Sequence, residues 1–357
     1  MGGAVKGRVL VLGRYDTGGQ THEAAAMMVD GRLDDLLIAP DDDIGFAPGA
    51  ILRATVDRQM KGQGGVFVRL PDGARGFLRE TGGLAPGQTL LVQITGHAEA
   101  AKALPVTTRL LFKSRYCIVT PQAPGINISR RIKDSGIRDA LDALATAAMA
   151  GSAFGLIVRS ACDGAADNDL TADIAQMRDL AEAVMADTAG PPELLVDAAS
   201  PHEEAWRDWC DPEPDAVEET EGAFATHGVD EAIDALLTPE VPLTGGGSMV
   251  IEPTRAFVAI DVNTGPDTSP AASLKANIAA ARELPRQLRL RGLGGQIIVD
   301  FAPMPKRDRA TLEQQLRTAF RFEAAETALA GWTPLGNFEL QRKRDRIALA
   351  TLLRGRA

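Results

Sequence analysis

Two short apolar runs in the second half of the chain each end on an acidic residue. "VAIDVNTG" carries Asp261 and Asn263, and "IIVD" ends at Asp300. Carboxylate and amide oxygens suit hard cations such as Mg²⁺ and Mn²⁺, whereas zinc favours nitrogen and sulfur ligands. Two adjacent carboxylates repel each other unless a proton or a cation neutralises one of them. These residues therefore allow a magnesium site that acts on a phosphodiester, and equally two carboxylates that cap the loops after their strands.

The elements around these residues must bring them together for the first interpretation to hold. A helical stretch, "AASLKANIAAARELPRQLRLR", lies between the two runs, and Pro285 is expected to kink or split it. A strand, a crossover helix and a second strand normally form two parallel neighbours in one sheet. Ligands of such sheets bind at the carboxyl ends of the strands. We therefore expect Asp261 and Asp300 to lie side by side there, with Asn263 just beyond.

Residues 49–108 read as a small all-β domain. Apolar and polar residues alternate in several short runs that glycine-rich turns separate, a pattern typical of an OB-type barrel. Phe67 and Phe77 fall on neighbouring strands. Paired aromatic rings on such a face stack nucleic-acid bases, and they can equally fill the barrel core.

Residues 109–190 alternate strands and helices. The strand "FGLIVRSAC" ends in Arg159 and Ser160, a guanidinium and a hydroxyl that could hold a phosphate. The other interpretation is an arginine paired with a nearby carboxylate. Within residues 186–240, "AGPPELL" and "DWCDPEPDAVEETEG" contain prolines and acidic residues, which is more typical of a loop or linker than of a packed element. The run "GVDEAIDALL" that follows them is expected to form a helix.

Composition and charge narrow the class of protein. The 357 residues carry a net charge of -10, yet Arg282 to Ala357 hold 15 Lys and Arg against 8 Asp and Glu. Such asymmetry fits either a nucleic-acid surface or a solvated helix face. The three cysteines form no CxxC pair, so we expect reduced, buried thiols rather than a zinc site. With no secretory signal and no apolar membrane span, a cytoplasmic protein without membrane contact is expected.

Several motifs resemble those of the ribonuclease E/G family. "FVAIDVNTG", "RQLRLRGLGGQIIVDFAPM" and "GNFELQRKR" are similar to its catalytic segments, and "AMMVDGRLDDL" resembles its N-terminal hairpin. "GFLRE" lies where the family has an RNA-binding barrel. "RYCIVTPQAPGINISRRI" and "GLIVRSA" resemble its 5′-end sensor. The likeness covers most of the chain and is weakest at residues 186–230.

The resemblance implies an α/β (α+β multidomain) fold. An OB-fold β-barrel would be inserted in a split ribonuclease H-like part, followed by a 5′-sensor subdomain and a DNase I-like catalytic subdomain. The expected segments are residues 1–48 (N-terminal hairpin of the ribonuclease H-like part), 49–108 (OB-fold RNA-binding barrel), 109–190 (5′-sensor-like subdomain), 191–240 (shortened acidic remainder of the ribonuclease H-like part) and 241–357 (metal-dependent catalytic subdomain).

The resemblance also implies a function, a single-strand-specific endoribonuclease. It would hydrolyse RNA phosphodiester bonds with Mg²⁺ or, as an alternative, Mn²⁺, give 5′-phosphate products and act in RNA processing or decay. The implied residues are Asp261 and Asp300 as metal ligands and catalytic groups, Asn263 as the catalytic amide beside them, Phe67, Phe77 and Lys102 as RNA-binding residues, and Arg159, Ser160, Ser114 and Ile118 as the 5′-phosphate pocket.

The chain departs from the family pattern at several positions. The zinc-binding Cys-Pro-x-Cys segment would follow "FELQRKR" and is not in the sequence, so no zinc and no zinc-linked dimer are expected. The sequence leaves the oligomeric state open. Pro303 stands where the family often has a third acidic residue, Ser114 replaces a usual glycine, and Ser160 replaces a usual threonine.

Two other functions remain compatible with these residues. One is an RNA-binding protein of the same fold whose cleavage activity is weak or lost, which the shortened middle segment would favour. The other is a metal-dependent DNase or phosphatase, against which the barrel and the family resemblance argue.

Overall fold

The structure is a computed structural model that describes residues 6–16, 20–41, 45–60, 64–79, 82–98, 102–267 and 269–353. The chain forms two compact units, which we call the terminal unit (residues up to Ile38 and from Val217 onward) and the central unit (Ala39 to Ala216). Both units combine sheets with helices, so the predicted mixed α/β fold is confirmed. The bounds of the five predicted segments stay a prediction.

Five strands of the central unit close into a barrel. They are β4 (Ile51–Met60), β5 (Gly65–Arg69), β6 (Arg75–Leu78), β7 (Thr89–Ile94) and β8 (Leu104–Thr107). Their order is β4-β5-β6-β8-β7, and pairing of β4 with β7 closes the ring. Every second side chain of a strand points to the same side, and the inward ones, such as Val66, Val68 and Leu78, are fully buried. The predicted OB-like barrel is therefore confirmed.

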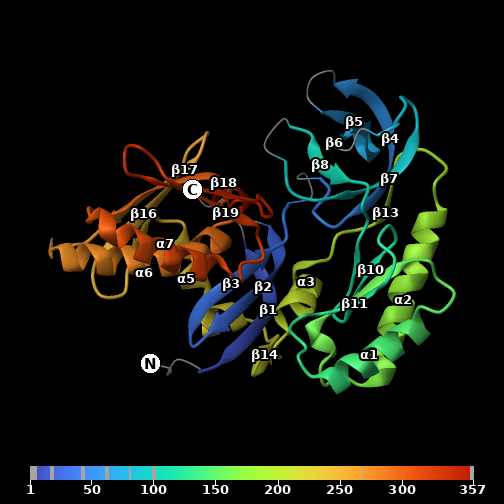
Figure 1. Cartoon of the computed structure of the whole chain (residues 1–357), viewed down its shortest axis with the longest axis horizontal. Coiled ribbons are helices and arrows are strands. Elements are labelled where there is room, and N and C mark those ends of the chain that lie inside the picture. The colour runs from blue at the N-terminus through green and yellow to red at the C-terminus, as the bar shows by residue number, and fades with distance from the viewer. Residues whose placement is uncertain are drawn as a thin grey trace. The chain divides into compact units, whose positions relative to one another are not determined.

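The rest of the central unit is a four-stranded sheet with helices packed against it (Figure 1). The sheet has the order β11-β12-β10-β9. The bounds are β9 (Phe112–Lys113), β10 (Cys117–Thr120), β11 (Ile126–Ile128), β12 (Gly155–Val158), the 3-10 turn η3 (Ser160–Cys162), and the helices α1 (Ser135–Ala148) and α2 (Asp167–Ala186). Asp134 caps α1 by accepting a hydrogen bond from the Ile137 N–H at 2.9 Å. The strand that ends at Arg159 is thus a central strand of a packed sheet.

The acidic stretch after residue 190 is more ordered than the sequence indicates. It contains β13 (Glu193–Val196), α3 (Pro201–Trp209), β14 (Ala216–Glu218), α4 (Ala223–Thr226) and α5 (Val229–Leu236). Ser200 and Glu203 form a capping box at the start of α3. Apolar residues spaced among the carboxylates, including Ala205, Phe224 and Ile233, are buried. The helix predicted over "GVDEAIDALL" is confirmed as α5. The prediction of a loop or linker was wrong where β13 and β14 form, because these short segments pair with β4 and β1.

The terminal unit holds two sheets. The first has the order β14-β1-β2-β3, with β1 (Arg8–Asp16), β2 (Thr21–Val29) and β3 (Arg32–Ile38). Asp30 and Gly31 both have positive φ, 48° and 75°, in the turn between β2 and β3, as the predicted hairpin requires. The second sheet has the order β15-β16-β17-β18-β20-β19. Its bounds are β15 (Glu240–Pro242), β16 (Ser248–Pro253), β17 (Val258–Asn263), β18 (Gly295–Asp300), β19 (Thr327–Trp332) and β20 (Phe338–Arg342).

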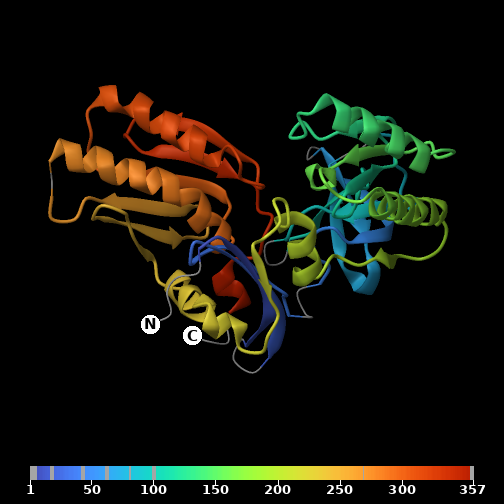
Figure 2. The same cartoon turned by 90° about the horizontal axis from the view of Figure 1, so that it is seen from below.

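Two helices cover one face of this second sheet. They are α6 (Pro270–Leu290) and α7 (Arg309–Phe320), which lie side by side in both views (Figures 1 and 2). The 3-10 turn η4 (Lys306–Asp308) leads into α7, and a short helix α8 (Leu349–Leu352) follows β20. Buried residues of both helices, such as Leu284 and Leu312, form one core with the inward side chains of β16, β17, β18 and β20.

Pro285 does not split α6. The helix runs from Pro270 to Leu290 with the proline inside it. A proline removes one hydrogen bond of a helix, but Leu284 and Leu288 on either side of it are buried in the core and hold both halves against the sheet. The prediction of a split was wrong because it weighed the local cost without this packing. No helix within the described ranges is long and apolar enough to cross a bilayer.

Candidate functional site

Asp261 and Asp300 lie opposite each other on adjacent parallel strands. In the register between β17 and β18, Val258 pairs with Ile297 and, three residues on, Asp261 pairs with Asp300. The parallel arrangement predicted from the order of strand, helix and strand is therefore confirmed. Both aspartates are exposed and stand at the carboxyl ends of their strands. They therefore form a pair of carboxylates at one edge of the sheet.

The face that carries these carboxylates is set by the two-residue period of a strand. The apolar residues of β17 are buried with α6 and α7, so Asp261 and Asn263 point to the opposite face. Asp300 follows the buried Val299 and points to that same face. The helices therefore pack on one side of the sheet, and the polar groups lie together on its open side.

Asn263 is tied directly to one of the carboxylates. Its Nδ2 donates a hydrogen bond to Oδ2 of Asp261 at 2.8 Å. Residues two apart on a strand share a face, which explains why this pair meets. The amide fixes the orientation of the Asp261 carboxylate. Among the described residues, no hydrogen bond reaches the carboxylate of Asp300.

A buried asparagine holds the backbone just beyond Asp300. Asn277 of α6 is completely buried, and its Nδ2 donates to the Ala302 carbonyl while its Oδ1 accepts from the Ala302 N–H, both at 2.9 Å. These two bonds tie the chain that leaves β18 to the helix behind it. Asn277 was not predicted from the sequence; the available signal was a polar residue on the buried face of α6.

The donor set at this edge fits a hard divalent cation. No three His, Cys, Asp or Glu side chains gather closely enough to hold a metal ion within the ranges that the structure describes. Mg²⁺ commonly takes one or two protein carboxylates and completes its shell with waters and phosphate oxygens. Two exposed aspartates opposite each other match that manner of binding.

The cysteines do not provide a competing site. All three are buried and reduced, as the sequence indicates. Burial raises the pKa of the Cys117 and Cys162 thiols to about 12 in each case. A thiol with so high a pKa carries almost no thiolate at neutral pH, so neither is suited to bind metal or act as a nucleophile.

Phe67 and Phe77 form an aromatic pair on the barrel surface. They face each other across β5 and β6, with ring centroids 5.4 Å apart and an interplanar angle of 59°. Both rings are partly exposed and lie outside the buried barrel core, which favours a surface role over core packing. A Cβ at Gly65 would overlap the Phe77 ring, so the glycine makes room for it. Lys102 is exposed three residues before Pro105, which pairs with Phe77.

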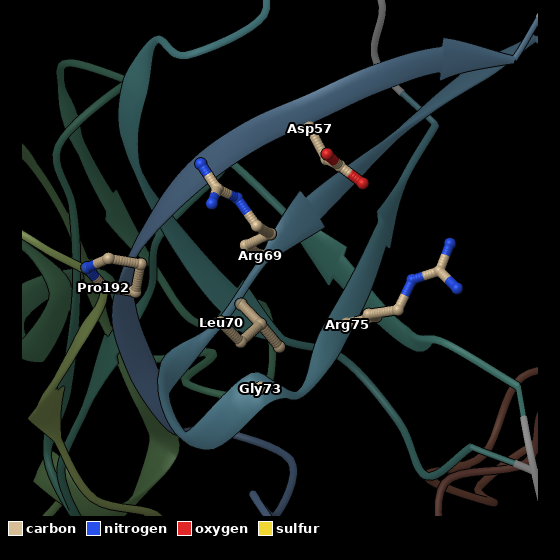
Figure 3. A pocket seen from close by; sticks show the side chains of 6 residues that line it. All are labelled: Asp57, Arg69, Leu70, Gly73, Arg75 and Pro192. Atoms are coloured by element: carbon tan, nitrogen blue, oxygen red, sulfur yellow. The ribbon is translucent and has the colours of Figure 1, made fainter.

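Two arginines extend this aromatic face. Arg69 pairs with Arg75 across the same two strands, and the Arg75 guanidinium lies 4.6 Å from the centre of the Phe67 ring. Figure 3 shows the hollow that both arginines line together with Asp57, with the two guanidinium groups directed away from each other. The spacing of Phe67 with Arg69, and of Arg75 with Phe77, is two residues. Because residues two apart on a strand share a face, this spacing could have predicted from the sequence that Arg69 and Arg75 lie on the same face as the two rings.

Arg159 stands at the end of β12, as predicted, and it is paired with the protein's own groups. Its guanidinium donates to the Ser114 carbonyl at 2.6 Å and to Oδ1 of Asp208 at 2.7 Å. Asp208 also accepts from Arg207 at 2.8 Å. Burial acts to raise the pKa of Asp208, but the hydrogen bonds and charges of the two arginines outweigh it and hold that pKa below its ordinary value.

Ser114 and Ser160 lie next to Arg159, and Ile118 lies on the neighbouring strand. Ser160 donates to Oδ2 of Asp211, and the Ser114 hydroxyl lies 2.5 Å from Oδ2 of Asp173 on α2. Ile118 is on β10, opposite Ile157 of β12. The sequence analysis left open whether Arg159 holds a phosphate or a carboxylate, and the structure has it on a carboxylate. The sequence analysis did not identify these acidic partners.

Comparison with known proteins places the chain in a family. The model of the ribonuclease E/G family matches residues 112–218 and 215–345, more than half of the chain. These matches include the strand ends that carry Arg159, Asp261 and Asp300.

Individual relatives are similar over most of this chain. Ribonuclease E of Nostoc sp. is 29% identical over 381 aligned residues that cover 91% of this chain and 55% of that protein. Ribonuclease G of Salmonella typhimurium is 28% identical, with 75% of this chain and 62% of that protein covered. Ribonuclease E of Haemophilus influenzae is 28% identical over 73% of this chain and 32% of its own length. The chain therefore spans less than two thirds of each of these relatives.

Proposed function

The chain belongs to the ribonuclease E/G family, and we propose that it is a single-strand-specific endoribonuclease that acts in RNA processing or decay. Relatives named ribonuclease E and ribonuclease G support this reading. The observation that carries it is the pairing of Asp261 with Asp300 on parallel strands, with Asn263 bonded to Asp261. We place the activity in the cytoplasm and expect 5′-phosphate and 3′-hydroxyl products.

The residues of this site have separable tasks. Asp261 and Asp300 would hold Mg²⁺, with Mn²⁺ as a substitute, at the sheet edge. When bound, the ion supplies positive charge that stabilises the charge developing on the scissile phosphate and lowers the pKa of a bound water. Asn263 keeps the Asp261 carboxylate in one orientation through its 2.8 Å hydrogen bond. Asn277 keeps the backbone after Asp300 in place through its two bonds to Ala302.

The barrel face is suited to bind single-stranded RNA. Phe67 and Phe77 present partly exposed rings on which bases can stack without regard to sequence. Arg69, Arg75 and Lys102 supply positive charge for the phosphate backbone near those rings. Arg159, Ser160, Ser114 and Ile118 stand at the positions that the resemblance assigns to the 5′-phosphate of the substrate.

A cleavage assay on a short fluorogenic single-stranded RNA tests the proposal. We expect turnover with Mg²⁺, none with EDTA, and loss of turnover in Asp261→Asn and Asp300→Asn. Glu252→Gln is the matched control, because Glu252 is an exposed carboxylate on β16 opposite Ala259, away from the carboxyl ends of β17 and β18. Equal, negligible turnover in all proteins together with tight RNA binding would refute the nuclease and leave the RNA-binding module.

A further inference from the structure

Arg159 and Ser160 are bonded to carboxylates of the same unit. Asp208 accepts from Arg159 and Arg207, and Asp211 accepts from Ser160 and, at 3.1 Å, from Arg131. Asp208 lies 49 residues beyond Arg159, and Asp211 lies 51 residues beyond Ser160. The contacts are therefore tertiary contacts built by the fold, and not a consequence of neighbours in sequence.

Buried neighbours anchor both carboxylates. Asp208 is in the last turn of α3, and Asp211 follows Cys210, the C-cap residue of that helix. Ala205 and Cys210 are 0% and 3% exposed, so the helix and its end are fixed in the packed part of the unit. The centre of the Trp206 ring, on the same helix, lies 5.9 Å from the guanidinium carbon of Arg115. The helix thus brings its two carboxylates to the end of β12 as part of the packed fold.

The two carboxylates take the interactions that a phosphate would use. A phosphate monoester is recognised by guanidinium and hydroxyl donors through its anionic oxygens. Here the donors of Arg159 and Ser160 already bond to carboxylate oxygens, and the Asp208 side chain is 36% and the Asp211 side chain 28% exposed. A phosphate that entered would bring between one and two further negative charges beside them. It would have to displace both carboxylates or meet their repulsion.

We propose that Asp208 and Asp211 are specificity-determining residues that occupy the donors of Arg159 and Ser160 as built-in anions, so that the protein binds RNA without regard to a 5′-monophosphate. This inference rests on the proposed function, in which single-stranded RNA is the substrate. Its consequence is a gain of function: removal of the two negative charges should leave Arg159, Ser160 and Arg131 available to a terminal phosphate. Asparagine keeps the shape of each side chain and one oxygen acceptor while it removes the charge.

A binding experiment separates this inference from catalysis. The probe is a ten-nucleotide single-stranded RNA with a 3′ fluorophore and either a 5′-monophosphate or a 5′-hydroxyl. Its dissociation constants are measured by fluorescence anisotropy in EDTA on the Asp300→Asn background, which excludes cleavage. The test proteins carry Asp208→Asn, Asp211→Asn or both. Asp139→Asn with Asp142→Asn is the control, because it removes two exposed carboxylates from α1 of the same unit.

The expected result is a change in the ratio of the two dissociation constants. The background protein and the control should bind both probes within about twofold of each other, whereas the double variant should prefer the monophosphate by about tenfold or more, the equivalent of one charge-assisted hydrogen bond. Thermal melting checks that each variant is folded. The comparison of the two probes on the background protein tests the inference without any substitution at Asp208 or Asp211.

Three outcomes would overturn the inference. They are a background protein that already prefers the monophosphate tenfold, a double variant whose ratio does not exceed that of the control, and no measurable binding of either probe. The cleavage assay with the fluorogenic RNA judges the nuclease proposal separately. If the protein cleaves RNA and its binding also prefers a 5′-monophosphate, this inference is wrong while the nuclease proposal stands.

Discussion

Asn277 allows a sharp test of how the scaffold supports the metal edge. Its side chain is completely buried and makes two 2.9 Å bonds to the backbone of Ala302, which is itself 4% exposed. Asn277→Ala removes both partners and leaves a buried N–H and a buried carbonyl unsatisfied. Each such group costs about 1–3 kcal/mol, so we expect a loss of about 2–6 kcal/mol in the free energy of unfolding of the terminal unit.

The consequence for activity follows from the position of Ala302, two residues after Asp300. Without the two hydrogen bonds from Asn277 to Ala302, the end of β18 can shift. We therefore expect the folded variant to have a lower turnover and to need a higher Mg²⁺ concentration for half-maximal cleavage. The unfolding free energy is measured by urea denaturation and the cleavage by the fluorogenic RNA. Gln314→Ala is the matched control, because Gln314 is an exposed amide on α7 of the same unit.

Two results would contradict the predictions for Asn277→Ala. If Asn277→Ala were as stable as Gln314→Ala within about 0.5 kcal/mol, the two bonds would contribute nothing net, contrary to the cost of burying unpaired groups. If that variant also kept the half-saturating Mg²⁺ concentration of the unaltered protein, Asn277 would have no positioning role.

Two further predictions concern the central unit. Phe67→Ala should raise the dissociation constant for single-stranded RNA by about 5- to 150-fold, since stacking contributes about 1–3 kcal/mol per base. Arg75→Ala should reduce the salt dependence of RNA binding. If neither variant differed from the exposed control Lys133→Ala in dissociation constant or salt dependence, the barrel face would not be the RNA-binding surface. The pKa of Asp208 is below the ordinary 3.8 in the folded state, so its stabilising contribution is present above that pH and is lost as the pH falls through the folded value. The difference in unfolding free energy between the unaltered protein and Asp208→Asn should therefore be largest at pH 7 and shrink in acid, and a difference that grew in acid would contradict this sign.

The sequence could predict the features that depend on local order. A strand, a helix and a strand in succession constrain the handedness and direction of the connection, so the pairing of Asp261 with Asp300 followed from spacing alone. The alternation of β5 and β6 likewise put Phe67 and Phe77 on neighbouring strands. Which roles these residues have stays a prediction, because pairing alone does not assign one.

The features that the sequence could not predict depend on contacts between distant segments. No residue near Arg159 or Ser160 in the sequence indicates that Asp208 and Asp211 are their partners, because only the packing of α3 brings these residues together. Pro285 has a strong local cost in a helix, yet buried leucines on both sides outweigh it. In each case a local rule gave way to tertiary packing, which a single sequence does not display.

Strand β17 carries core residues and site residues in strict alternation, and this limits how the protein can change over evolution. Substitution of an exposed residue such as Asp261 leaves the buried positions of the strand untouched. Insertion or deletion of a single residue before Asp261 would instead exchange the two sets, turning carboxylates toward the helices and valines toward water. Descendants of this chain can therefore lose or alter the chemistry of the edge by point substitution and keep the fold, whereas a change in the length of this strand would cost both at once.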